Sequence, residues 1–488
     1  MLTLHLDWKT GKSLVDFGDL GNALFVRYPI LVIVADDARF QAGKGDGLTI
    51  ITKTDVAIVG GGISGTALLY LLARYTDIKD ICLFEKYDKI AIVNSNGTHN
   101  SQTLHCGDIE TNYSLEKALE VQASANMVVR YVGQLPERDN ILFKFPKMVL
   151  GVGEQECDSL RLRFEKFSPH FSANRLFEAK DIERIEPQVM QGRKEPVVGM
   201  GVENEYTAVN FNALANSFVE NARSVTGKNI SVQLGTKITN ISQDGSLFRL
   251  KTNKGVVEAR FVVVSAGGHS LLYAQGMGYG LNYSCLPVAG SFYFTPQVLN
   301  GKVYTIQNDK LPFAAVHGDP DILVEGKTRF GPTALILPML ERYNYKTIPE
   351  FFKVLRPDSR VLKVFWDLFK VSDTRNYIFK NMLFEVPLLR RRLFLQDVRK
   401  IVPSLKLSDL SYAKNFGGIR PVMIDKDNCK LHLGEARISP GSGIIFNMTP
   451  SPGATSCLGN AVKDVETIVE FLACGYEKQQ LEQDLLTD

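Results

Sequence analysis

The 488-residue sequence lacks an uninterrupted apolar run of the roughly 20 residues that a membrane-spanning helix needs. Its best candidate, YPILVIVA at residues 28–35, is far too short. Cysteine is also scarce, and no CxxC pair or regular spacing links the seven residues at positions 82, 106, 157, 285, 429, 457 and 474. This pattern argues against the disulfide framework of a secreted protein, so we expect reduced cysteines in an intracellular protein.

Metal-binding and nucleic-acid-binding motifs are absent as well. The seven histidines are scattered and form no signature such as HExxH, so the sequence predicts no metal site. The charge is nearly balanced, with 56 Lys/Arg and 53 Asp/Glu. The absence of any nucleic-acid-binding motif argues against nucleic acid as a partner. The content of 45% apolar and 22% charged residues is that of an ordinary globular protein, long enough for two or three domains.

The sequence does contain a dinucleotide-binding motif. Residues 54–65 read TDVAIVGGGISG, in which an apolar run ends at Gly60 and the spacing Gly60, Gly62, Gly65 opens the Ala/Leu-rich stretch TALLYLLARY. A strand, a glycine turn and a helix in this order let backbone N–H groups approach a pyrophosphate at the positive end of the helix. Glu85 ends the next apolar run, where a carboxylate can bind both hydroxyls of a ribose. The motif therefore predicts a dinucleotide with an unphosphorylated adenosine.

A second apolar strand favours a flavin over a nicotinamide. The segment ARFVVVSAGGHS (259–270) ends in small residues, but no second complete GxGxxG follows it. One complete motif and one such strand suit a single, permanently held FAD, whose ring reaches into a second domain built from strands rich in β-branched and aromatic residues. We expect an α/β (α+β mixed) fold. Its predicted parts are a Rossmann-like FAD-binding domain (54–145, 211–280 and 411–475) and a mixed β-sheet substrate domain (146–210 and 281–410).

Two segments are open to more than one interpretation. Residues 1–53 carry six basic and six acidic residues, unlike an acid-poor transit peptide, and a targeting leader, an appended strand or the choice of start site all remain open. Residues 341–400 hold 14 Lys/Arg and 7 Asp/Glu, interleaved with aromatic residues and Leu at helical spacing. This basic helical segment, which includes Arg390, Arg391 and Arg392, lies on an anionic membrane surface or packs its apolar stripe on its own domain.

Five ordered blocks of the sequence carry a resemblance to a known family. They are NSQTLHCGDIETNYSLEKA (100–118), CLPVAGSFYF (285–294), KLPFAAVHGDPDILVEGKTRFGPTA (310–334), FGGIRP (416–421) and FNMTPSPGATSCLGNA (446–461). From about residue 54 onward the chain closely resembles the malate:quinone oxidoreductases, especially the shorter form of epsilonproteobacteria and apicomplexans. That family belongs to a wider group of FAD-dependent enzymes similar to D-amino-acid oxidase.

The resemblance implies a reaction and a location. The expected reaction is FAD-dependent oxidation of L-malate to oxaloacetate, with the electrons passed to a membrane quinone and without nicotinamide. The expected location is peripheral, on the inner face of the bacterial cell membrane or on the mitochondrial inner membrane of a eukaryote.

Oxidation of a 2-hydroxy acid requires a hydride acceptor for C2 and a base for the hydroxyl proton, and a neutral imidazole suits the second task. By resemblance His317 is the expected base, and His105 is the second candidate. The substrate carboxylates require cations, and Arg420 matches the carboxylate-binding arginine of related flavoenzymes. Lys327 and Arg329 are weaker substrate-binding candidates, with an exposed β-hairpin as the alternative.

The remaining candidates are expected to contact FAD. By resemblance, the stretch from Thr98 to Gln102 passes under the isoalloxazine ring, and Gln102 also counts among the catalytic candidates. Residues 453–455 lie at an expected helix N-terminus, where N–H groups can stabilise negative charge on the reduced flavin. The expected FAD-binding residues are Gly60, Gly62, Ser64, Gly65, Glu85, Lys86, Thr98, Asn100, Ser101, Lys237, Ala266, Gly267, Gly453, Ala454 and Thr455.

Two alternatives to malate oxidation are open on the sequence alone. The same flavin mechanism would serve another 2-hydroxy acid, such as lactate or L-2-hydroxyglutarate. A flavin-binding protein that has lost turnover would keep the fold, but the presence of His317 and Arg420 argues against it.

Overall fold

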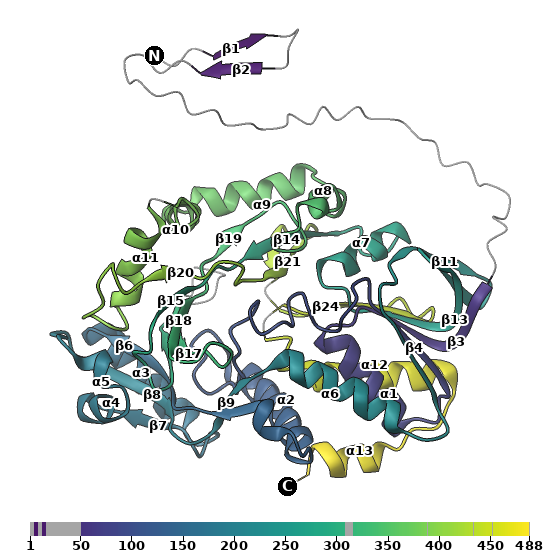
Figure 1. Cartoon of the computed structure of the whole chain (residues 1–488), viewed down its shortest axis with the longest axis horizontal. Coiled ribbons are helices and arrows are strands. Elements are labelled where there is room, and N and C mark those ends of the chain that lie inside the picture. The colour runs from purple at the N-terminus through teal and green to yellow at the C-terminus, as the bar shows by residue number, and fades with distance from the viewer. Residues whose placement is uncertain are drawn as a thin grey trace. The chain divides into compact units, whose positions relative to one another are not determined.

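The computed structural model describes residues 4–7, 12–15, 50–307, 316–387, 389–432, 434–450 and 452–487. The chain divides into two compact units, residues 1–47 and residues 48–488. In the first unit, strands β1 (Leu4–Asp7) and β2 (Lys12–Val15) pair antiparallel. The rest of that unit, including the apolar run 28–35, lies outside the described residues. All other elements belong to the second unit (Figure 1).

A largely parallel sheet forms the right-hand part of the second unit in Figure 1, in the order β10-β4-β3-β13-β12-β11, with β24 also beside β13 and β23 beside β24. Strands β4 and β13 run parallel to β3, β10 runs parallel to β4, and β24 runs parallel to β13. The bounds are β3 (Ile50–Val59), β4 (Asp80–Phe84), β10 (Asn229–Gln233), β11 (Ile238–Asp244), β12 (Leu247–Thr252), β13 (Gly255–Val264), β23 (Ala436–Ile438) and β24 (Ile444–Met448).

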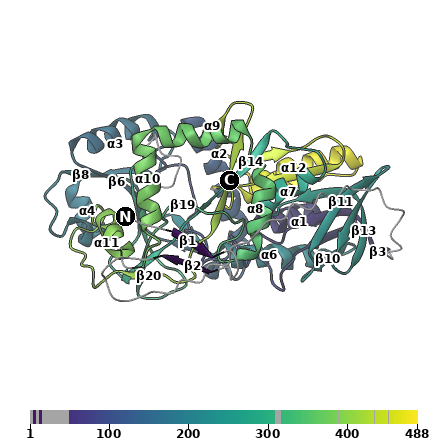
Figure 2. The ribbon, with the colours of Figure 1, turned by 90° about the horizontal axis from the view of Figure 1, so that it is seen from above.

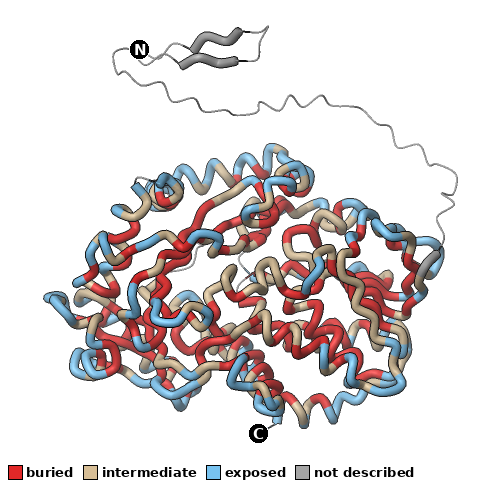
Figure 3. Tube along the Cα trace, in the orientation of Figure 1, coloured by how far each residue is buried: buried red, intermediate tan, exposed pale blue. Residues whose placement is uncertain are grey.

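Both faces of this sheet are covered, as continuous apolar strands require. Alternate residues of β3 point to opposite faces, so Val56 and Ile58 join one apolar cluster and Ala57 and Val59 join another. The first cluster contains α1 (Ile63–Tyr75), α6 (Phe211–Ser224) and α12 (Cys457–Leu472), with α2 (Leu115–Gly133) and α13 (Lys478–Leu485) beside them. The second contains α7 (Gly268–Gly276) and parts of the helices that follow residue 347. Figure 3 shows the strands buried between these layers.

Two further sheets complete the unit. One has the order β20-β15-β18-β17-β16-β6-β8-β7 and the other the order β19-β14-β21-β22, while β5 pairs with β9. Their bounds are β5 (Leu142–Lys144), β6 (Lys147–Val152), β7 (Arg175–Phe177), β8 (Val197–Val202), β9 (Tyr206–Val209), β14 (Tyr283–Ala289), β15 (Tyr293–Pro296), β16 (Lys302–Thr305), β17 (His317–Pro320), β18 (Lys327–Gly331), β19 (Leu335–Ile336), β20 (Ser411–Tyr412), β21 (Ile419–Asp425) and β22 (Lys430–His432).

The predicted boundary at residue 410 falls inside these sheets, because β20 and β21 pair with β15 and β14. The division into an FAD-binding and a substrate domain stays a prediction. The helices of this part are α3 (Glu154–Phe167), α4 (Ala179–Ile185) and α5 (Pro187–Met190), and the short 3-10 turns are η1 (Arg138–Asn140) and η2 (Tyr345–Thr347).

The basic segment 341–400 is largely helical, as its pattern predicts. It forms α8 (Ile348–Leu355), α9 (Ser359–Lys370), α10 (Ser372–Leu383) and α11 (Arg390–Arg399), along the upper left edge of Figure 1. Asp358 begins α9 by accepting the backbone N–H groups of Arg360 and Val361, each at 3.0 Å. Across the described ranges, no helix has the length and apolar character needed to cross a membrane.

Candidate active site

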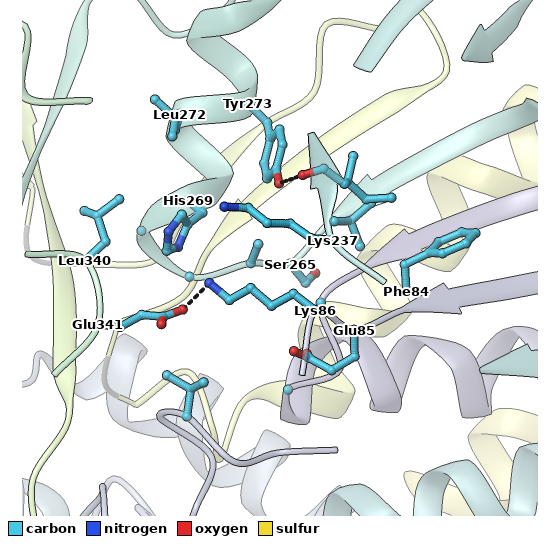
Figure 4. Close-up of a pocket in the computed structure, with 18 of the residues that line it drawn as sticks. Phe84, Glu85, Lys86, Lys237, Ser265, His269, Leu272, Tyr273, Leu340 and Glu341 are labelled. Atoms are coloured by element: carbon cyan, nitrogen blue, oxygen red, sulfur yellow. Dashed lines mark hydrogen bonds and ion pairs between the residues drawn. The ribbon is translucent and has the colours of Figure 1, made fainter. Parts of the chain in front are cut away.

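A cavity of about 500 Å³ lies at the carboxyl ends of β3, β4 and β13 (Figure 4). In sheets of this kind, ligands bind at the carboxyl ends of the parallel strands. Its lining includes Gly60, Gly62, Ser64, Glu85, Lys86, Lys237, Ala266, Gly267 and Ala454, all of which are expected cofactor residues.

The three glycines of the motif have different tasks. Gly60 has a φ of 114°, and a Cβ on it would lie 2.4 Å from the carbonyl oxygen of Ser265. A Cβ on Gly65 would lie 2.0 Å from the carbonyl oxygen of Gly60, so Gly65 permits α1 to pack against the turn. A Cβ on Gly62 would meet only Ser95 Oγ, at 3.3 Å, although Gly62 itself lines the cavity. Gly60 and Gly65 are thus required by the protein's own packing, and Gly62 keeps space for a ligand.

Glu85 is placed to bind a ribose. Its Oε2 accepts the N–H of Gly61 at 2.8 Å and its Oε1 accepts the N–H of Tyr87 at 3.0 Å, which fixes the carboxyl group at the cavity. Burial raises the pKa of Glu85. Each oxygen keeps a further lone pair that can accept a ribose hydroxyl. Together with the glycine turn, this arrangement fits the FAD predicted from the sequence.

The two lysines at this end of the cavity already have carboxylate partners. Lys86 pairs with Glu341, and Lys237 pairs with Glu350 at 3.2 Å. Glu350 also binds His269 at 2.9 Å, and this hydrogen bond lowers the pKa of Glu350 to about 2. Figure 4 shows Lys86 pointing toward Glu341 and Lys237 pointing toward His269. Because both lysines are paired, they agree with the expected adenosine without a 2′-phosphate.

A smaller cavity of about 150 Å³ continues from the first. Both are lined by Asn94, Pro421, Thr449 and Ala454. Its polar lining includes Asn100, Ser101, Thr103, His105 and Arg420, and its apolar lining includes Val288, Ala289, Phe292, Pro332 and Ala334. A dinucleotide in the larger cavity can therefore extend toward a chamber that holds both an imidazole and a guanidinium.

The motif FGGIRP brings Arg420 to this chamber. Gly417 has a φ of 131°, and a Cβ on it would lie 1.9 Å from the carbonyl oxygen of Gly290. A Cβ on Gly418 would lie 2.3 Å from the carbonyl oxygen of His99. Any larger residue at these two positions would push the start of β21 away from the backbone at Gly290 and His99. The two glycines therefore allow β21 to bring Arg420 to the chamber.

Arg420 is the cation best placed for a substrate carboxylate. Among the residues that the structure describes, none forms an ion pair with it, while its charge interacts with Tyr304, Tyr113 and Tyr377. The side chain is only partly exposed, and burial lowers the pKa of the guanidinium. A guanidinium that is shielded from water favours an anionic partner, and a carboxylate can bind it through two hydrogen bonds.

His105 lines the same chamber and forms a pair with Glu110. Its Nδ1 lies 2.7 Å from Glu110 Oε1, and its backbone N–H donates to Thr455 Oγ1 at 3.1 Å. Burial alone would raise the pKa of Glu110, but the hydrogen bond and the charge of His105 lower it to about 2. The carboxylate therefore stays ionised at neutral pH and holds Nδ1, which leaves Nε2 for a ligand. Sequence reasoning missed Glu110, although it lies in the same block as His105.

His317 lies behind the chamber. It is buried in β17, its ring stacks on Tyr304 with the centroids 4.2 Å apart, and its Nε2 lies 3.5 Å from Asp319 Oδ2. The hydroxyl of Tyr304 is 2.7 Å from Thr103 Oγ1, and Thr103 lines the chamber. His317 itself is not among the described lining residues of either cavity. Residues 310–315 of its sequence block lie outside the described residues.

The weaker candidates divide into a buried and an exposed residue. Arg329 is fully buried, pairs with Asp321 at 3.2 Å and donates to the carbonyl oxygen of Gly97 at 3.3 Å. Gln102 donates to the same oxygen at 3.0 Å, so both side chains hold the loop under the chamber. Lys327 is exposed and lines neither cavity. The alternative interpretation of both residues, an exposed β-hairpin, therefore describes Lys327 but not the buried Arg329.

Some of the other expected FAD residues line the two cavities, and others do not. Asn100 and Ser101 line the smaller one, while Thr98 accepts the N–H of Gly417 at 2.9 Å through its carbonyl oxygen. Residues 453–455 precede α12, which begins at Cys457, as expected for a helix N-terminus. Of these three, Ala454 lines both cavities.

Comparison with known proteins relates most of the chain to one family. The sequence model described as "Malate:quinone oxidoreductase (Mqo)" matches residues 52–458. A probable malate:quinone oxidoreductase of Campylobacter jejuni is 50% identical over 443 residues, which cover 88% of this chain and 99% of that protein. The malate:quinone oxidoreductase of Helicobacter pylori is 44% identical over 439 residues, covering 88% and 97%.

Among solved structures, an L-α-glycerophosphate oxidase of Mycoplasma pneumoniae with FAD bound superposes with a TM-score of 0.59 at 18% identity, covering 86% of this chain and 95% of that one. This likeness confirms the predicted fold class. The family match over most of the chain and the two relatives confirm the resemblance predicted from the five sequence blocks. This protein belongs to the malate:quinone oxidoreductase family.

Proposed function

We propose that this protein is an FAD-dependent enzyme that oxidises L-malate to oxaloacetate and passes the electrons to a membrane quinone. The observation that carries the proposal is the chamber beside the dinucleotide cavity, which is lined by both His105 and Arg420. Arg420 has no carboxylate partner among the described residues. Such a chamber offers a proton acceptor and an anion-binding group to a hydroxy acid. Family membership supports malate as that acid.

Each residue has a defined task in the reaction. Arg420 binds a carboxylate of malate and orients C2. His105 Nε2 accepts the hydroxyl proton while the C2–H bond breaks, and Glu110 stabilises the positive charge that develops on the imidazole. When bound, FAD accepts the hydride from C2 and supplies two electrons to the quinone. His317, stacked on Tyr304 behind the chamber, acts as a positioning residue.

An anaerobic titration tests the function directly. Malate is expected to bleach the visible absorbance of the bound flavin, and a soluble quinone added afterwards should restore it. Lactate and L-2-hydroxyglutarate serve as comparison substrates. If either acid bleached the flavin faster than malate, that acid would be the preferred substrate. No bleaching by any of the three would favour a flavin-binding protein without turnover.

The substitution Gly62→Val is expected to yield folded protein with little or no FAD. A Cβ at this position has only one close neighbour, Ser95 Oγ at 3.3 Å, so the branched side chain projects into the cavity rather than into the protein. Bound flavin per protein, measured by absorbance, checks this, with circular dichroism as the folding control. A folded variant with one FAD per chain would show that the cofactor does not pass this turn.

The substitution Glu110→Gln tests the role of the paired carboxylate. An amide can still accept the hydrogen bond from Nδ1, but it cannot balance a positive charge on the ring. We expect slower flavin reduction by malate, because the positive charge that develops on the imidazole loses its counter-charge. Stopped-flow measurement of the flavin absorbance checks the rate. An unchanged rate would remove Glu110 from the mechanism.

We further propose that the protein acts at an anionic membrane surface. This would be the inner face of the bacterial cell membrane, or the mitochondrial inner membrane in a eukaryote. A quinone is confined to the bilayer, and basic, apolar-rich helices such as those of segment 341–400 suit its surface. Of the expected arginines, Arg390 stacks on Tyr412 and Arg391 donates to the carbonyl oxygen of Leu407, whereas Arg392 is exposed. Other side chains of the segment are therefore better placed for lipid.

A further inference from the structure

Exposed apolar side chains are concentrated on one part of the molecule. Of the 17 large hydrophobic side chains exposed in the described part of the chain, 12 lie within residues 343–389. Scattered exposed hydrophobic residues are normal, but a contiguous patch marks an interaction surface. The members on the helices are Phe352 on α8, Leu362, Trp366 and Phe369 on α9, and Phe379, Met382 and Leu383 on α10.

The residues of α9 and α10 form one continuous surface, which we call the α9–α10 face. Leu362, Trp366 and Phe369 follow one another at helical spacing, and Leu362 and Trp366 are 63% and 69% exposed. The rings of Phe369 and Phe379 lie 6.2 Å apart, which joins the two helices. Figure 2, which looks onto this edge of the molecule, shows α9 and α10 meeting at an angle at its surface.

The cations around this face indicate what covers it. Arg356 before α9, Lys370 at the end of α9 and Arg375 on α10 are exposed, and none of the described residues forms an ion pair with them. An apolar ridge flanked by free cations complements the interface of an anionic bilayer, where apolar side chains enter the acyl region and cations reach the headgroups.

The opposite side of α10 touches the wall of the active site. Thr374, Ile378 and Asn381 are buried there, and Asn381 Oδ1 accepts the backbone N–H of Ala334 at 2.7 Å. Ala334 lines the smaller cavity, together with Pro332. A single helix, about 10–12 Å across with its side chains, therefore lies between the α9–α10 face and the chamber that holds Arg420.

We propose that the α9–α10 face enters the bilayer and that the quinone ring reaches the flavin along the seam between α10 and residues 332–336. This inference rests on the proposed function and assigns the place of the electron acceptor. The apolar part of the chamber lining, including Val288, Phe292, Pro332 and Ala334, lies on the route, whereas the charged part serves malate. Quinone reduction takes two electrons from the reduced flavin and two protons, so the acceptor leaves as a quinol.

The first experiment tests insertion of the face. The sequence has only two tryptophans, Trp8 and Trp366, so Trp8→Phe leaves Trp366 as the sole indole. With FAD-loaded protein, anionic vesicles are expected to shift the emission of Trp366 to the blue, and brominated acyl chains should quench it. Neutral vesicles or high salt should weaken both effects. An emission spectrum that anionic vesicles leave unchanged while the protein sediments with them would place the docking surface elsewhere.

The second experiment uses two matched double variants to separate membrane docking from access of the quinone to the flavin. Leu362→Ser with Phe369→Ser changes α9, and Phe379→Ser with Met382→Ser changes α10. Both should weaken vesicle binding about tenfold or more, because each removes two large apolar side chains from the lipid. Flavin reduction by malate should stay at the parent rate in both, since none of the four residues lines a cavity.

The decisive comparison uses enough vesicles to bind all of the protein. Under this condition we expect the α9 variant to recover the parent rate of flavin reoxidation by a long-chain quinone in the vesicles. The α10 variant should remain several-fold slower, although a short soluble quinone reoxidises it normally. Equal recovery of both variants would overturn the seam as the route. A parent protein whose flavin malate cannot reduce would instead overturn the proposed function, whatever the vesicle results.

Discussion

The substitution His105→Ala is expected to slow flavin reduction by malate by about 10²–10⁴-fold, the usual contribution of a positioned general base. His105 lines the chamber, and Glu110 holds its Nδ1 at 2.7 Å, so Nε2 is the group available to the hydroxyl proton. FAD should be retained, because the side chain does not line the larger cavity. Stopped-flow measurement of the flavin absorbance after mixing with malate checks the rate.

The matched control for this substitution is His317→Ala. His317 was the first candidate from the sequence, but its ring stacks on Tyr304 behind the described lining. We expect its loss to slow reduction much less than loss of His105. The opposite order, with a large loss for His317→Ala and a loss under threefold for His105→Ala at every pH, would return the role of base to His317.

The substitution Arg420→Ala is expected to weaken malate binding by about 30-fold to several thousand-fold, because truncating one partner of a buried, hydrogen-bonded charge pair costs about 2–5 kcal/mol. In the described structure no carboxylate neutralises Arg420, so malate supplies its anionic partner. Arg420→Lys should recover part of the affinity, since an ammonium keeps the charge but cannot bind a carboxylate through a planar fork. The malate dependence of flavin reduction measures both variants.

Lys327→Gln provides the control for Arg420. Lys327 is exposed and lines neither cavity, so its change should leave the malate dependence at the parent value. If Arg420→Ala bound malate within threefold of the parent while Lys327→Gln did not, the anion-binding group would lie outside the chamber described here.

The dinucleotide site was predictable because its geometry is local. A β-branched strand, the turn at Gly60 and the start of α1 follow one another directly in the sequence, and Glu85 directly follows the next parallel strand. The periodicity of the apolar residues fixes the type of each element, and parallel strands bring their carboxyl ends to one edge. Ala266 and Gly267 could be added for the same reason, since they come just after β13, the strand that pairs with β3.

The pairing at the reaction chamber was not predictable from any pattern. His105 and Glu110 are five residues apart, a spacing that no helix or strand converts into contact, and the intervening turn brings them together. Likewise, nothing in the sequence separates His105 from His317, since both are single histidines in ordered family blocks. In the structure His105 lines the smaller cavity, whereas His317 stacks on Tyr304 of β16 and is not among the described lining residues.

The sequence by itself determined the family, the fold class and the cofactor-binding turn, because these depend on local periodicity, glycine spacing and long ordered motifs. Only the tertiary structure decided which side chains share a cavity and which of the described cations have no ion-pair partner. Arg329 and Arg420 look alike as isolated arginines, yet β18 buries the first against Asp321 whereas β21 presents the second to the chamber. Ion pairing and burial depend on residues brought together from distant parts of the chain, so no local pattern encodes them.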